Sequence, residues 1–98
     1  MRDDAIGKTV KATLRQLARI APGRAIEVRV PPYAAVQCGA GPVHTRGTPP
    51  NTIEMSAQTW LALAQGTRTW EEAMNSGEVR ASGVRADLSH YLPLEGLR

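Results

Sequence analysis

The side chains best suited to chemistry in this 98-residue chain lie in one loop. Residues 44–51, HTRGTPPN, combine His44 and Arg46 with two threonines and an asparagine. An arginine fork and neighbouring hydroxyls present several hydrogen-bond donors to a carboxylate or phosphate, so His44 and Arg46 are candidate contacts for an anion. The alternative is that both side chains pair with carbonyls that an irregular loop leaves unpaired. Both interpretations stay open at this point.

The other reactive side chains have ordinary structural explanations. Cys38 lies between Gln37 and Gly39, without a neighbouring base or cation to form a thiolate, and is expected to pack in a core. His44 and His90 stand apart from other metal-ligating residues at zinc-motif spacing. The Glu71-Glu72 pair fits the first turn of a helix, where acids favour the positive end of the helix dipole. We therefore expect no enzyme activity, no metal site and no cofactor.

Composition limits the class of protein. A chain that is 42% hydrophobic and 21% charged is expected to form one domain over residues 1–98. The net charge of +3 comes without a long basic run, so nucleic acid is not an expected partner. A single cysteine suits a reducing compartment, and neither a signal peptide nor an apolar run of roughly 18 residues is visible. The sequence therefore favours a cytoplasmic protein.

The clearest local pattern is an amphipathic helix that starts at Asp3 or Asp4 and ends before Pro22. Apolar residues recur along one face of it at Ile6, Val10, Leu14, Leu17 and Ala21. The opposite face carries a basic stripe, which consists of Lys8, Lys11, Arg15 and Arg19. The stripe is either a solvated outer surface or a transient contact for an anionic membrane.

Strands are expected in four short stretches after this helix and in one near the end of the chain. Strict alternation at 25–30 and a second pattern at 33–38, separated by Pro31-Pro32, predict two strands. Residues 43–45 and 52–55 predict a third and a fourth, and residues 78–83 a fifth. The first three strands would form a meander, and the 44–51 loop would cross to the fourth.

Two short helices and a closing helix complete the expected order. Ser56 is placed to cap the first of them and Gly66 to end it. Thr69 and Glu72 have the spacing of a capping box, which predicts where the next helix starts. Apolar residues from Val84 to Leu92 then recur at helical spacing, and they predict a helix at the end of the chain.

These elements carry a family resemblance. The LALAQG ending of one helix (61–66), an aromatic-led second helix, the EVRASG strand (78–83) and the apolar end resemble the sterol carrier protein type 2 family. The resemblance is to its compact bacterial branch. It implies an α+β fold with a five-stranded mixed, mainly antiparallel sheet, helices on one face, and the order α-βββ-crossover-β-αα-β-α.

The resemblance also implies a function. Family domains bind or transfer a hydrophobic ligand without catalysis, in an apolar pocket between sheet and helices, and that ligand is a fatty acyl chain, acyl-CoA, sterol or phospholipid. Carried onto this chain, the implied lining residues are Trp60, Leu63, Trp70, Met74, Leu88, Tyr91 and Leu92. His44 and Arg46 are then candidate contacts for the headgroup of that ligand. The alternative is a ligand-free structural or protein-interaction module that can form a homodimer.

Overall fold

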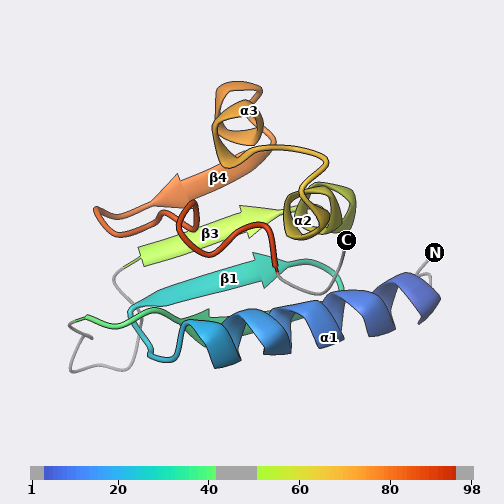
Figure 1. The fold of residues 1–98 in the computed structure, drawn as a ribbon, viewed down its shortest axis with the longest axis horizontal. Helices are drawn as coiled ribbons and strands as arrows, with labels where there is room; N and C mark the ends of the chain where they lie inside the picture. Colours follow the sequence, from blue (N-terminus) through green and yellow to red (C-terminus); the bar gives the residue numbers. More distant parts are fainter. Residues whose placement is uncertain (1–3, 42–50, 95–98) are drawn as a thin grey trace.

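The computed structural model describes residues 4–41 and 51–94 (Figure 1). They form three helices and four strands. In chain order these are α1 (Asp4–Ile20), β1 (Ile26–Val30), β2 (Ala34–Cys38), β3 (Asn51–Met55), α2 (Ala57–Gln65), α3 (Trp70–Asn75) and β4 (Val79–Ser82). The α+β class is confirmed.

The sheet is mixed, with the strand order β2-β1-β3-β4. β1 pairs antiparallel with β2 and parallel with β3, and β4 pairs antiparallel with β3. Four strands are described where five were predicted. The predicted strand at 43–45, the meander that it would complete, and the loop with His44 and Arg46 lie outside the described residues, apart from Asn51.

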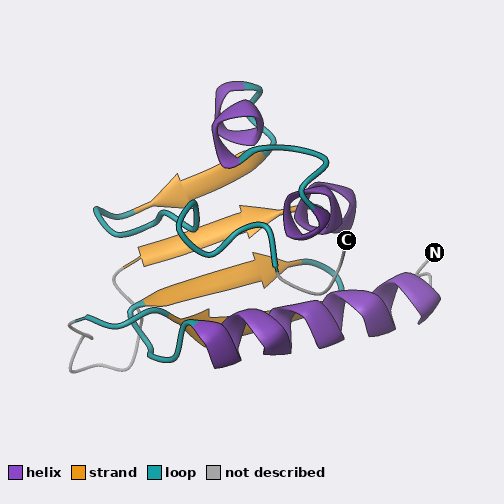
Figure 2. Ribbon diagram, in the orientation of Figure 1, coloured by secondary structure: helices purple, strands orange, loops and turns teal. Residues whose placement is uncertain are grey.

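The two faces of the sheet differ in polarity, as strand alternation dictates. Ile26, Val28 and Val30 of β1 and Ile53 and Met55 of β3 are buried on one face. α1, α2 and the last described residues cover that face (Figure 2). The other face carries mainly polar residues in register, among them a row in which Arg29, Glu54 and Arg80 are neighbours across β1, β3 and β4. The core therefore lies on one side of the sheet.

α1 packs its predicted apolar face into this core. Val10, Leu14 and Leu17 have no exposed surface, and the helix contacts β2 and α2. A buried hydrogen bond of 2.8 Å joins the helices, because Trp60 Nε1 of α2 donates to Thr13 Oγ1 of α1. This bond fixes α2 against α1.

The predicted helix boundaries at α2 and α3 are confirmed. The Ser56 hydroxyl accepts from the Thr59 amide, and Gly66 ends α2 in the left-handed region at φ 84°. Thr69 and Glu72 form both bonds of the capping box at the start of α3. Local sequence is enough for these boundaries because each bond joins residues three apart in the chain.

The predicted closing helix is wrong. Residues 83–94, called the C-terminal segment below, form turns and bends. Other groups take the amides that a helix would use: Arg85 N donates to Asn51 Oδ1, and Ser89 N donates to Asp87 Oδ1. Leu88 and Leu94 are fully buried whereas Val84 is fully exposed, so the apolar residues do not share one helical face.

No helix in the described part of the chain is long and apolar enough to cross a membrane.

Candidate functional site

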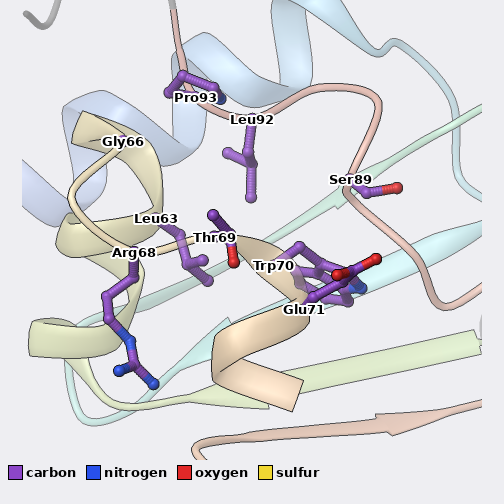
Figure 3. A pocket seen from close by; sticks show the side chains of 9 residues that line it. All are labelled: Leu63, Gly66, Arg68, Thr69, Trp70, Glu71, Ser89, Leu92 and Pro93. Carbon is purple, nitrogen blue, oxygen red and sulfur yellow. The ribbon is translucent and has the colours of Figure 1, made fainter. Parts of the chain in front are cut away.

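A surface hollow of about 280 Å³ lies between the end of α2, the start of α3 and the C-terminal segment (Figure 3). We call it the first hollow. Its apolar lining consists of Leu63, Trp70, Leu92 and Pro93. Its polar lining consists of Arg68, Thr69, Glu71 and Ser89, and Gly66 completes it. An apolar hollow with a few polar groups is the usual form of a small-molecule site.

The turn between α2 and α3 sets the helical side of the hollow. Gly66 adopts a left-handed conformation, and the amides of Thr67 and Arg68 then donate to Ala62 O at 2.9 and 3.3 Å. The capping box follows directly and makes Trp70 the first residue of α3. Leu63 and Trp70 thereby line one hollow from two consecutive helices.

The C-terminal segment forms the opposite wall. It begins beside the sheet, where Arg85 N donates to Asn51 Oδ1 at 2.9 Å, and it ends beside α2, where Leu94 N donates to Ala64 O at 2.9 Å. Leu88 and Leu94 are buried between these ends. The stretch that carries Leu92 is therefore held at both sides, and Leu92 points into the hollow (Figure 3).

A polar cluster braces the outer edge of the helical wall. Arg68 forms an ion pair with Glu78, and Glu78 Oε1 also accepts from Ser76 Oγ at 2.6 Å. The hydrogen bond from Ser76, followed by the charge of Arg68, lowers the pKa of the Glu78 carboxyl despite some desolvation. The Nε atom of Arg68 is buried and has no hydrogen-bond partner among the described residues.

A second hollow, of about 410 Å³, adjoins the first. It is lined by Ile20, His90, Tyr91, Leu92 and Pro93. Leu92 and Pro93 line both hollows and therefore separate them. Ile20 is the last residue of α1 and is 50% exposed, so apolar surface continues to the end of that helix.

The structure divides the seven residues implied as ligand contacts into three groups. Leu63, Trp70 and Leu92 line the first hollow, and Tyr91 lines the second with Leu92. Trp60 and Leu88 lie in the core with no exposed surface. Met74 is 38% exposed and lines neither hollow.

Part of the lining of the two hollows could not be predicted from the sequence. Arg68, Ser89, Pro93 and Ile20 reach the hollows only because the C-terminal segment lies against α2 and near α1. No local spacing encodes that long-range packing. Of the donors predicted in the 44–51 loop, Asn51 is a buried strand residue whose amide binds Ala25 O and Arg85 N.

The remaining candidate groups have clear placements. Within residues 4–41 and 51–94, no three His, Cys, Asp or Glu side chains gather closely enough to hold a metal ion. Cys38 is buried as expected, and burial raises the pKa of its thiol to about 11. Exposed side chains make up the basic stripe of α1: Lys8, Lys11, Arg15 and Arg19.

A family model described as "Bacterial SCP ortholog" matches residues 2–94. No curated protein matches the chain. The matched range includes α1, the whole described sheet and every residue that lines the two hollows.

Proposed function

This chain belongs to the bacterial SCP (sterol carrier protein) ortholog family, and on that premise we propose that it holds one apolar chain in the first hollow. Membership of this family supports a general role in binding or carrying lipids. The proposed ligand is a single-chain amphiphile such as a fatty acid, and the proposed activity is binding and transfer without catalysis.

The observation that carries the proposal is the apolar lining that Leu63, Trp70 and Leu92 form at the surface. Buried apolar contacts contribute about 25 cal/mol per Å² of area withdrawn from water. An acyl chain gains this energy mainly by covering Trp70 and Leu92, because Leu63 is only 1% exposed. The sheet-facing core is filled by side chains such as Trp60 and Leu88, which favours the surface hollow over the space between sheet and helices.

The volume of the hollow favours a slender ligand. Ligand sites usually measure roughly 300–1,000 Å³, and about 280 Å³ lies just below this range. A rigid sterol or a two-chain phospholipid needs more enclosed space than a single chain. Arg68 lines the hollow, and its positive charge there favours a ligand that carries a carboxylate or phosphate.

An anionic membrane is the partner that we propose for loading and release. The basic stripe of α1 is exposed along the helix, and Ile20 extends apolar surface from its last turn toward the second hollow. Basic side chains attract anionic lipids, while an exposed isoleucine can enter the headgroup region. Docking by this face places the second hollow close to the lipid surface.

The test uses the two tryptophans as internal reporters. Trp70 lines the first hollow and Trp60 is fully buried, so a bromine-labelled fatty acid should quench Trp70 emission and spare Trp60. Trp70→Phe is the matched control, because it keeps an aromatic ring and removes the tryptophan that lines the hollow. Native mass spectrometry of protein purified from cells, followed by lipid extraction, would give the class of the bound molecule.

The proposal predicts saturable quenching in the wild-type protein and its loss in Trp70→Phe. Wild-type protein that is free of lipid in native mass spectra and shows no saturable quenching would refute it. Equal quenching of both proteins would show that the probe binds away from the first hollow, which also contradicts the proposal.

A second candidate function, a homodimer without ligand, has one observation in its favour. β4 is at the end of the described sheet, and the fully exposed Val84 follows it closely. An edge strand of this kind can pair with the same strand of a second copy. Sedimentation velocity would support this function if the dimer dissociates in an Ala81→Pro variant, since proline interrupts strand pairing at an edge.

A further inference from the structure

The first and second hollows share part of their lining. Leu92 and Pro93 are the two residues that line both of them. The proline ring has a fixed position relative to its backbone, so the Leu92 side chain is the part of this wall that can change shape. That side chain points into the first hollow, of about 280 Å³ (Figure 3).

Leu92 differs from its apolar neighbours in the C-terminal segment. Leu88 and Leu94 have no exposed surface and anchor the segment in the core, whereas Leu92 is only partly buried. Backbone hydrogen bonds at Arg85 and Leu94 hold the segment on either side. The size of residue 92 can therefore vary without removing an anchor of the fold.

We propose that Leu92 determines how long an apolar chain the site accepts. This inference rests on the proposed function. A chain that enters beside Arg68 and lies along Leu63 and Trp70 meets the Leu92 side chain at the end of the first hollow. A smaller residue there joins the two hollows and lets the chain continue past Tyr91 toward Ile20.

The expected behaviour follows from the burial of methylene groups. Each methylene withdrawn from water strengthens binding about fourfold. In the wild-type protein, affinity should rise by about this factor with each added carbon and then level off when the chain reaches Leu92. In Leu92→Ala the rise should continue to longer chains.

The experiment titrates each protein with saturated fatty acids from octanoate to stearate, below their critical micelle concentrations, and follows Trp70 fluorescence. Leu61→Ala is the matched control, since Leu61 is another partly buried leucine that packs on the core and lines neither hollow. Leu92→Val makes a smaller change in case Leu92→Ala unfolds. Leu92→Trp fills the end of the hollow and should level off at a shorter chain than wild type.

The outcomes separate this inference from the function on which it rests. A shift to longer chains in Leu92→Ala or Leu92→Val, absent in Leu61→Ala, supports the role of Leu92. If the wild-type protein binds fatty acids and all Leu92 variants show the same chain-length dependence, Leu92 does not determine chain length. The proposed function then stays intact. An equal shift in Leu61→Ala overturns it as well, because general loosening then explains the change. No binding of any fatty acid by the wild-type protein refutes both.

Discussion

Replacing Thr13 with valine should destabilise the protein far more than the same replacement one helical turn earlier. Thr13 is 4% exposed, and its hydroxyl oxygen accepts the hydrogen bond from Trp60 Nε1 at 2.8 Å. Valine has nearly the same shape and keeps the β-branched character of the residue. Thr13→Val therefore removes the acceptor for Trp60 and, besides it, the hydroxyl's own bonds to Thr9 O and Val10 O. The indole N–H of Trp60 is then left unpaired in the core.

The magnitude follows from the burial of that donor. Leaving a buried donor unsatisfied costs about 1–3 kcal/mol of unfolding free energy. In a domain of this size, each kcal/mol lowers the Tm by roughly 4–8 °C. Thr13→Val should therefore lower the Tm by at least about 4 °C. Thr9→Val is the control: Thr9 is exposed on the same helix, and its hydroxyl also donates to a carbonyl four residues earlier.

Thermal and urea unfolding followed by circular dichroism would measure both variants. The exposed Thr9→Val should change stability by no more than about 0.5 kcal/mol. Adding Thr13→Val to a Trp60→Phe protein should cost less than adding it to the wild type, because the N–H that it orphans is already gone. Equal losses in Thr13→Val and Thr9→Val would refute the claim that this bond holds α2 against α1.

Three further predictions concern charge and reactivity. The pKa of Glu78 is lowered in the folded protein by Ser76 and Arg68, so its contribution to stability is present above the unfolded pKa of about 4.3 and is lost as pH falls through the folded pKa. Glu78→Gln should therefore show a weaker fall of Tm with acidification below that pH, and a slope equal to that of wild type would contradict the assignment. Each basic-stripe substitution, such as Lys11→Gln, should weaken binding to phosphatidylserine vesicles about fivefold at low salt, with little binding to neutral vesicles in either protein; an unchanged affinity would rule out docking through α1. Burial raises the pKa of the Cys38 thiol to about 11, so a disulfide reagent at neutral pH should react at the rate of unfolding, and fast labelling of the native protein would show that the thiol is accessible.

Local signals in the sequence predicted the elements whose hydrogen bonds join near neighbours. The caps at Ser56 and Gly66 and the capping box at Thr69 are of this kind. The apolar face of α1 was predictable for a related reason, since Val10, Leu14 and Leu17 follow the helical period and are all buried. The alternation at β1 likewise separated the core face of the strand from its polar face.

The C-terminal segment shows where such signals fail. Its apolar spacing from Val84 to Leu92 fits a helix, yet the backbone amide of Arg85 binds the side chain of Asn51, 34 residues earlier. Long-range bonds of this kind do not appear in any local pattern. The candidate site depends on the same segment, so the sequence indicated Leu63, Trp70 and Leu92 through the family resemblance but not the wall that gathers them.

The Asn51 side chain also orders the assembly of the molecule in time. Its amide nitrogen donates to Ala25 O at the start of β1, and its amide oxygen accepts from Arg85 N. The same side chain thus joins the C-terminal segment to β1 and β3, whose parallel pairing closes over a long intervening chain and is therefore slow. We infer that the wall of the first hollow docks late in folding and opens first in native-state hydrogen exchange, before the sheet. A ligand held against that wall would slow hydrogen exchange there most.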